Sequence, residues 1–331
     1  MDDASFRAVQ RRLAARLPDA RSVGDGVPLE LRATGPDQPR LVDSHVVEGH
    51  AMRAVRVEGA AIVGFAAFLD GTQRSEVLCY ADGLPVIHGT VAAVVRSRHN
   101  RRMRTWASGP IVRRSVYAPL TMIPERYRSE LLALSGAGLV VVDTTEGGWV
   151  PDQGPHPASL LERAMSLVQR DRERAEQELA ERWCAKDEGT LFIDGGISGT
   201  DRVAGAACVV GVVKSHRTLH VPPDGVGALT RLGRAERSSA FVVASTRRAP
   251  VLSWYLRLRD PVGRDPFFGL VRVEVAYESD MRTDPRRVSA RAEEVSRWVL
   301  AEGSPLAMPD SRWDKMVYGV RDCEEFLRAV C

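Results

Sequence analysis

The sequence lacks the patterns that would mark a secreted, zinc-binding or membrane protein. Its five cysteines include no Cys-x-x-Cys pair, which argues against a disulfide framework and a thiolate zinc site. The seven histidines show neither His-Glu-x-x-His nor His-x-His spacing. No stretch approaches the roughly 20 apolar residues that span a bilayer, and the first residues lack an apolar signal core. We therefore expect a chain of the reducing cytoplasm without membrane contact.

Common nucleotide-binding signatures are also missing, since neither a P-loop nor a Gly-x-Gly-x-x-Gly motif occurs. The net charge of +3 is too small to indicate a nucleic-acid partner by itself. Positive charge is nevertheless concentrated within residues 96–104, which could neutralise phosphates or simply form a solvated loop. The candidate nucleic-acid contacts in this cluster are Arg96, Arg98, Arg101, Arg102 and Arg104.

The apolar pattern predicts one compact α/β domain at 59–331 after an N-terminal extension at 1–58. The extension begins with a helix that ends at Pro18, and the irregular stretch that follows would suit docking of a partner. Within the domain, the continuous apolar run 61–69 is typical of a strand buried on both faces. Further strands are expected near 75–80, 84–95, 138–143, 190–193, 207–214, 239–244, 252–258 and 269–276, and helices near 123–135, 157–185, 286–301 and 312–330.

Two aspartates stand where the most apolar runs end. Asp70 follows 61–69, and Asp194 follows Thr-Leu-Phe-Ile at 190–193; each precedes a glycine. Asp-Gly is a frequent turn dipeptide, so either instance alone favours a turn. Two matched instances indicate a functional pair, because a carboxylate at the end of a buried strand is costly unless something compensates its charge.

The expected topology brings this pair together. The second run follows a long helix, so a right-handed crossover can place it parallel to the first strand. Paired carboxylates would then repel one another unless a divalent cation lay between them. Two such ions can bind both the attacking and the leaving oxygen of a phosphodiester.

The helix at 157–185 offers a third acidic ligand. Glu176 borders the apolar stripe of this helix, whereas Glu173 lies further round. Either glutamate could belong to a solvated charged face, and we take Glu176 as the candidate ligand.

Several segments resemble the NurA family of DNA-end-processing nucleases. Phe-Leu-Asp70-Gly71-Thr72 and Leu-Phe-Ile-Asp194-Gly195-Gly196 resemble its two Asp-Gly motifs. Val-Val-Gly211-Val-Val-Lys214-Ser215 is similar to its Gly-Val-Val-Lys-Ser strand, and 304–310 is similar to the segment that opens its last helix. Two intervening segments, 254–258 and 271–274, follow in the same order, and together these cover about residues 60–330.

This resemblance implies a ribonuclease H-like mixed sheet flanked by helices, with Mn²⁺- or Mg²⁺-dependent cleavage at DNA ends. It also implies a homodimer and a HerA-type hexameric ATPase as partner, in DNA end resection or anti-phage defence. Asp70, Asp194 and a helix glutamate would take the metal-binding positions, and Lys214 would contact phosphate. Where the family usually has a histidine, Asp310 stands nearest, which puts the fourth ligand position in doubt.

Other interpretations remain open at this stage. Arg257 could line a DNA channel or belong to a salt-bridged face. A scaffold without its chemistry could bind DNA or dock the ATPase. An actin-like phosphotransferase also uses Asp-Gly-Gly turns, as at 194–200, although no adenosine-binding Gly-Gly turn is evident near the C-terminus.

Overall fold

The computed structural model describes most of the chain, as residues 5–22, 39–100, 102–107, 109–135, 139–148, 154, 156–222, 225–245, 248–303 and 318–330. Arg101 and Asp310 lie outside these residues, as does the motif at 304–310, so the roles expected for them stay predictions.

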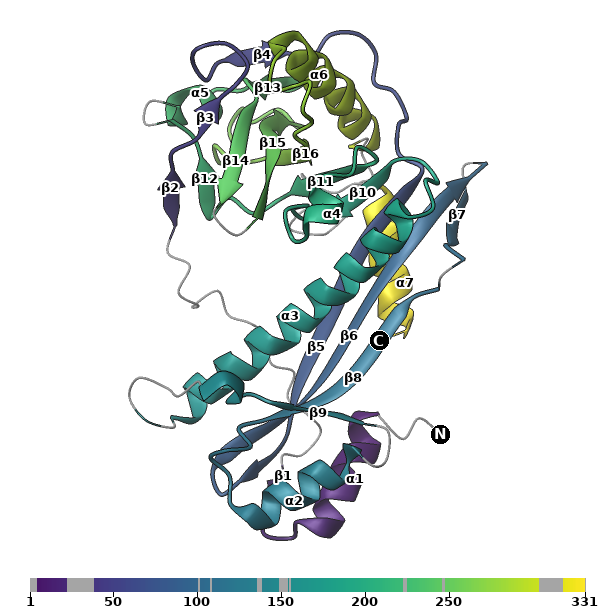
Figure 1. Cartoon of the computed structure of the whole chain (residues 1–331), viewed down its shortest axis with the longest axis vertical. Coiled ribbons are helices and arrows are strands. Elements are labelled where there is room, and N and C mark those ends of the chain that lie inside the picture. Colours follow the sequence, from purple (N-terminus) through teal and green to yellow (C-terminus); the bar gives the residue numbers. More distant parts are fainter. Residues whose placement is uncertain are drawn as a thin grey trace.

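A mixed sheet runs the length of the elongated molecule (Figure 1). The strands β5 (Ala67–Ala81), β6 (Leu84–His99) and β8 (Ile111–Ala118) form an antiparallel meander. The strand β10 (Leu191–Asp194) lies parallel to β5, and β11 (Val209–Val213) lies parallel to β10. The expected mixed sheet is therefore present, in the order β8-β6-β5-β10-β11 across its middle.

The sheet continues beyond β11 into the compact upper part of Figure 1 through antiparallel pairs. These strands are β16 (Leu270–Ala276), β15 (Arg248–Arg257), β14 (Phe241–Ser245) and β3 (His45–Val46). Shorter strands pair locally: β1 (Arg21–Ser22), β2 (Arg40–Val42), β4 (Ala54–Arg56), β7 (Arg102–Thr105), β9 (Val140–Asp143), β12 (Thr218–His220) and β13 (Glu236–Ser238).

The turn expected at Asp70-Gly71 does not form. β5 passes straight through it, so residues 67–69 and 75–80 belong to one strand. Hydrogen bonding explains the difference, because β6 pairs with β5 on both sides of Asp70. The meander is therefore made of β5, β6 and β8, and Asp70 lies within a strand rather than at its end. Residues 61–66, predicted to be part of a buried strand, lie outside β5.

The described helices surround this sheet. They are α1 (Phe6–Arg16), α2 (Glu125–Ala133), α3 (Pro157–Cys184), α4 (Asp201–Ala204), α5 (Val226–Thr230), α6 (Pro285–Glu302) and α7 (Tyr318–Val330). A short 3-10 segment, η2, spans Glu146–Gly148. The long helix predicted at 157–185 is thus confirmed within one residue.

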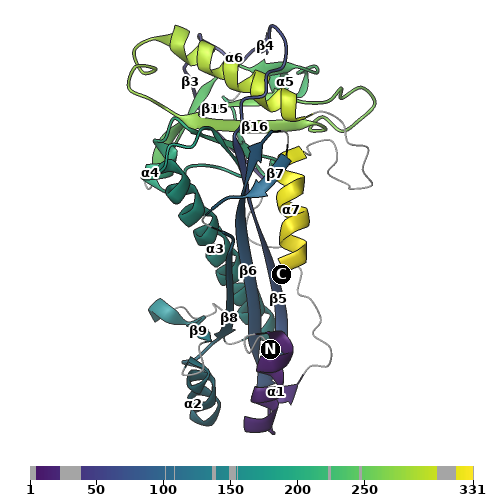
Figure 2. The same cartoon turned by 90° about the vertical axis from the view of Figure 1, so that its right-hand side faces the viewer.

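The helices α3 and α7 cover opposite faces of the β5–β6 pair (Figure 2). Successive side chains of a strand point to opposite faces. Accordingly Leu69 packs in the cluster that contains Leu179 of α3, whereas Phe68 packs in the cluster that contains Leu327 of α7. This alternation decides which helix each polar residue of β5 faces.

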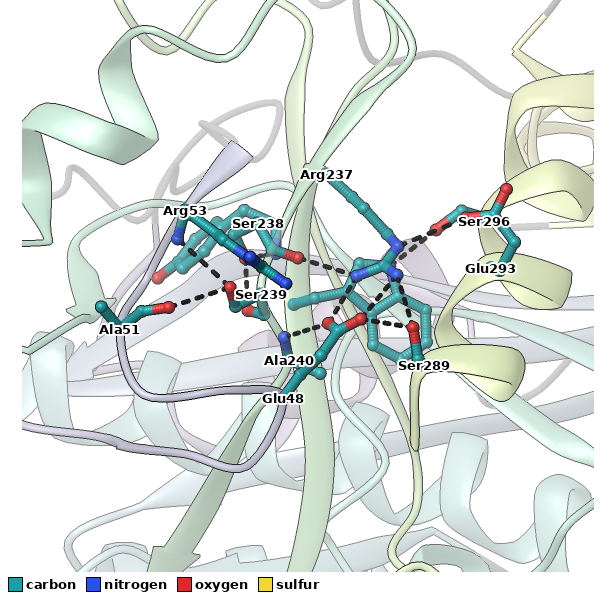
Figure 3. Close-up of polar contacts among 12 residues, drawn as sticks. Glu48, Ala51, Arg53, Arg237, Ser238, Ser239, Ala240, Ser289, Glu293 and Ser296 are labelled. Atoms are coloured by element: carbon teal, nitrogen blue, oxygen red, sulfur yellow. Dashed lines mark hydrogen bonds and ion pairs between the residues drawn. The ribbon is translucent and has the colours of Figure 1, made fainter. Parts of the chain in front are cut away.

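The N-terminal segment is part of the same sheet, because β3 pairs with β14 and β4 pairs with β13. A buried ion pair fastens it: both terminal nitrogens of Arg237 contact the Glu48 carboxylate, at 2.6 and 2.8 Å (Figure 3). Ser289 of α6 and the Ala240 amide donate to the same carboxylate at 2.6 and 2.9 Å. Residues 45–56 are therefore tied to the sheet on the C-terminal side of the expected boundary at 58/59.

The far end of the molecule has its own core. α1 and α2 pack against the distal halves of β5 and β6 through a cluster that includes Leu13, Leu78, Val86 and Leu131. Figure 1 shows this end well away from α6.

Candidate functional site

Asp70 and Asp194 lie side by side on neighbouring parallel strands. Ile193 is opposite Leu69, and each aspartate is the next residue along its strand. By alternation with Phe68 and Phe192, which pack in the α7-side cluster, both carboxylates face α7. The parallel placement inferred from the sequence is thus what the structure has.

Asp70 is a buried residue, 8% exposed, and the charge of its carboxylate is poorly compensated. Burial raises the pKa of Asp70 to about 8, with the Asp194 charge as the second cause. Lys214 lowers this pKa, Glu176 raises it, and the Gly71 amide donates to Asp70 Oδ1 at 2.8 Å. At neutral pH this carboxyl therefore retains its proton unless additional positive charge arrives.

Lys214 provides positive charge beside the pair. It follows the end of β11, and its Nζ lies 2.8 Å from Asp194 Oδ2. Its side chain is only 14% exposed. Lys214 is therefore held inside the site by an ion pair rather than extended into solvent.

Glu176 reaches the site from the opposite face. A Cβ on Gly71 would lie 2.3 Å from Glu176 Oε1, so the carboxylate rests directly on the β5 backbone beside Asp70. Arg172, one turn earlier on α3, forms an ion pair with Glu176 and donates to Gln73 Oε1 at 3.2 Å. Burial raises the pKa of Glu176 to about 7, although Arg172 lowers it. Glu173 instead accepts a hydrogen bond from Gln169.

An open cleft of about 450 Å³ lies on the α7 side of the aspartates. Its lining includes Asp70, Thr72, Asp194 and Lys214 from the sheet and Glu324 and Arg328 from α7. The sequence analysis did not single out Glu324 or Arg328, because they look like ordinary charged residues of an amphipathic helix. The packing of α7 on Phe68 through Leu327 is what brings them to the site.

A second, smaller cavity of about 250 Å³ lies on the α3 side. It is bounded by α3 and by the turn after β10, and we call it the turn cavity. Arg172, Asp194 and Gly195 line both spaces, so the two meet at the end of β10.

The turn after β10 is held by a buried acid that the sequence analysis placed only in a matching strand. Glu274 of β16, 2% exposed, accepts a hydrogen bond from the Ile197 amide at 2.9 Å and is paired with Arg272 at 2.5 Å. Gly195 has a φ of +145°, which favours glycine. A Cβ on Gly211 would lie 2.6 Å from the Gly195 carbonyl oxygen, so the Gly-Val-Val-Lys strand needs its glycine for this close approach.

No group of three His, Cys, Asp or Glu side chains in the described part of the chain is already arranged to hold a metal ion. The reason is that the three acids approach from opposite faces of the sheet. Asp70 and Asp194 face α7, whereas Glu176 approaches over Gly71 from α3 and is paired with Arg172. The oxygen donors themselves are the kind that Mg²⁺ and Mn²⁺ use.

The arginines predicted to bind nucleic acid have different environments. Arg257 is fully buried and donates to the carbonyls of Leu232, Pro266 and Phe268, so its assignment to a DNA channel was wrong. An arginine in a strand was a misleading indication of DNA contact, because backbone carbonyls can accept all the hydrogen bonds of a buried guanidinium, and no sequence pattern reveals this.

The arginines on β6 are also engaged with the protein. Arg96 pairs with Asp322 of α7 at 2.5 Å, and Arg98 binds both carboxylate oxygens of Glu302 at 2.8 and 2.6 Å. Arg102 and Arg104 on β7 are exposed. Among the described arginines of residues 96–104, Arg102 and Arg104 are the two that are exposed to solvent.

No helix in the described residues is long and apolar enough to cross a membrane. The four described cysteines are free thiols.

Comparisons with known proteins show a likeness at the level of structure alone. No protein family and no curated protein matches the chain. Among solved structures, the chain is similar to the NurA nuclease from Sulfolobus solfataricus, with 10% sequence identity and a TM-score of 0.36. The match covers 86% of this chain and 81% of that chain. A likeness of this degree does not establish a shared activity, so function must be argued from the site.

Proposed function

We propose that the chain is a metal-dependent deoxyribonuclease that hydrolyses phosphodiesters at DNA ends. The observation that carries this proposal is the buried Asp70 carboxyl, beside Asp194 on the neighbouring parallel strand, with a pKa raised to about 8. Such a pair is stabilised when a cation binds between its members. The same strands, in the order β8-β6-β5-β10-β11, would form a ribonuclease H-like sheet.

The donor set supports binding of Mg²⁺ or Mn²⁺ through few protein ligands. Mg²⁺ is commonly bound by one or two carboxylates together with substrate phosphates, rather than by a complete protein cage. Asp70 and Asp194 would supply these two carboxylates. Glu176 lines the turn cavity together with Asp194, so it would join them at the end of β10 once Arg172 releases it. Glu324 lines the cleft on the other side.

The proposed reaction adds water across a phosphodiester. The water oxygen forms a bond to phosphorus, the bond from phosphorus to the leaving oxygen breaks, and the water proton ends on that leaving oxygen. When bound, the divalent ion lowers the pKa of water and offsets charge on the phosphate. Lys214 holds Asp194 in place and offsets negative charge at the carboxylates, and Arg328 lies in the cleft where a phosphate can be held.

Arg102 and Arg104 are proposed to contact the DNA backbone outside the cleft, and Arg101 with them. The sequence resemblance extends the proposal to a homodimer that works with a HerA-type hexameric ATPase.

The test is cleavage of end-labelled linear DNA with Mn²⁺ by the wild type, Asp70→Asn and Asp194→Asn. Asp187→Asn is the matched control, because Asp187 lies in an exposed turn with a φ of +48° that asparagine tolerates. We expect the wild type and the control to cut. Each site variant should lose at least about a hundredfold in rate, as expected when a group that stabilises transition-state charge is removed.

One observation favours a second candidate, a scaffold that binds DNA or docks the ATPase without cutting. Lys214 and Arg172 already neutralise Asp194 and Glu176. DNA binding without cleavage, with a HerA-type ATPase and ATP also present, would replace the nuclease by this scaffold.

A further inference from the structure

The turn cavity is not explained by the carboxylate pair, although it meets the cleft at Asp194. We propose that it is a subsite for the terminal nucleotide of a DNA strand, so that the released product is a nucleoside monophosphate. This inference rests on the proposed nuclease function and adds the size of the unit removed.

The dimensions of the cavity favour one small occupant. Its volume of about 250 Å³ lies near the lower end of small-molecule cavities, which run from about 300 to 1,000 Å³. It is bounded on one side by α3 and on the other by the turn 195–200, so it has room for one nucleotide and not for a duplex.

Its walls combine an apolar surface with polar groups. Ala180, Ile193, Ile197 and Val203 are buried and supply an apolar surface for a base or sugar. The Gln177 amide, which lines the cavity, packs directly on Gly199 of the turn, where a Cβ would lie 2.3 Å from Gln177 Nε2. Among the described residues this amide has no hydrogen-bond partner, so its donors and acceptor are available to a ligand.

Charge decides which part of a nucleotide would enter. Glu173 and Glu176 line the cavity and disfavour a phosphate inside it. Arg172 lies at the junction with the cleft, and Lys214 lies just beyond it in the cleft. The phosphate would therefore stay at the junction, beside Asp194, while the nucleoside fills the cavity.

The glycine at position 195 leaves room for a DNA strand to pass from the cleft into the turn cavity. The DNA strand must cross the end of β10, where Gly195 lines both the cleft and the turn cavity. A side chain there would stand between the cleft and the turn cavity, and the φ of +145° already favours glycine.

The test measures binding to the full chain without metal, using deoxyadenosine 5′-monophosphate and deoxyadenosine 3′-monophosphate in EDTA. Gln177→Ala removes the amide, and Ser198→Trp places a large side chain at the cavity wall. Glu162→Ala is the matched control, because Glu162 is exposed on the same helix and does not line the cavity. Thermal unfolding checks that each variant is folded.

We expect saturable binding of at least one monophosphate to the wild type. Gln177→Ala should weaken it about three- to tenfold, the loss of one net hydrogen bond. Ser198→Trp should abolish it, and Glu162→Ala should stay within about twofold, because it removes no cavity contact. The better-bound isomer identifies the strand end that enters.

Two outcomes would overturn the inference: no saturable binding to the wild type, or equal binding to the wild type and both cavity variants. DNA cleavage together with either outcome would leave the nuclease standing and remove only the subsite. Monophosphate binding without DNA cleavage would remove the nuclease and leave the turn cavity only as a nucleotide-binding site. In cleavage assays, mononucleotides from the wild type and longer fragments from Ser198→Trp would support the subsite.

Discussion

Asp70 sits in the least favourable electrostatic position of the described site residues. Its carboxyl is buried, a second aspartate is its neighbour in the sheet, and Lys214 is already bound to that neighbour. Without a cation the folded protein holds a proton there at neutral pH that the unfolded chain would release. Its titration is therefore linked to folding.

Asp70→Asn should stabilise the metal-free protein at pH 8 by roughly 1–3 kcal/mol. Between the ordinary pKa of 3.8 and the folded value of about 8, the folded state binds more protons, so wild-type stability falls as pH rises through this window. The asparagine cannot titrate and should remove this slope. Urea unfolding at pH 5 and pH 8 in EDTA measures it. A wild type equally stable at both values would contradict the raised pKa.

Arg172→Gln should shift the acid limb of the cleavage rate to higher pH. Burial raises the pKa of Glu176 to about 7, and Arg172 is the main influence that lowers it. Without that charge, a larger fraction of Glu176 is protonated at pH 7, and a protonated carboxyl is a poor metal ligand. The pH–rate profile checks the shift. An unmoved limb would show that Glu176 does not act in the reaction.

At the scale of elements, the site depends on close contact between α3 and β5. Glu176 lies against Gly71, where any side chain would collide with its carboxylate. Glu176 of the 28-residue helix α3 can therefore contact the sheet only because Gly71 of β5 has no side chain.

Gly71→Ala should lower cleavage by about ten- to a hundredfold, since a displacement of about 1 Å in a catalytic group can cost this much. The new Cβ would stand 2.3 Å from Glu176 Oε1, and the glutamate must move away. Glu176→Ala and the double variant Gly71→Ala/Glu176→Ala provide the comparison. If both defects act through Glu176, the double variant should be no worse than Glu176→Ala. Additive losses would mean that Gly71 matters for another reason.

Apolar runs predicted the elements better than turn residues did. The run 190–193 was recognisable as a buried strand, and the long helix before it made a parallel pair predictable. Of the run 61–69 only residues 67–69 belong to β5, and Ile62 and Val63 are exposed. The Asp-Gly turn signal was overridden by continuous pairing of β5 with β6. The position of Glu324 in the cleft could not be predicted from the sequence, because it depends on how α7 packs on the sheet.

At the scale of the whole molecule, a buried polar network joins segments far apart in sequence. Glu48, Arg237 and Ser289 come from the N-terminal segment, β13 and α6. Burial alone would raise the pKa of Glu48, but the hydrogen bonds and charge of Arg237 outweigh it and the pKa is lowered. The carboxylate therefore stays ionised at neutral pH.

Glu48→Ala should cost about 3 kcal/mol of stability, because it leaves the buried guanidinium with only the Glu293 carboxylate, 3.6 Å from Nε, as counter-charge. Arg237 is 1% exposed and cannot recover hydration without local unfolding. Replacing both residues, as Glu48→Leu/Arg237→Met, should recover much of this loss. Chemical denaturation measures each variant. A loss under 1 kcal/mol in the single variant would show that the segment is not fastened by this pair.

The strand β5 fixes the distance between the carboxylate site and the α1–α2 end of the molecule. Asp70 is near one end of this strand and Ala81 is at the other, where α1 packs. At about 3.3 Å per residue, the eleven steps between them span roughly 36 Å. That length equals about ten base pairs of duplex at 3.4 Å each. Anything held by the α1–α2 end therefore stands about one helical turn of DNA from the carboxylates.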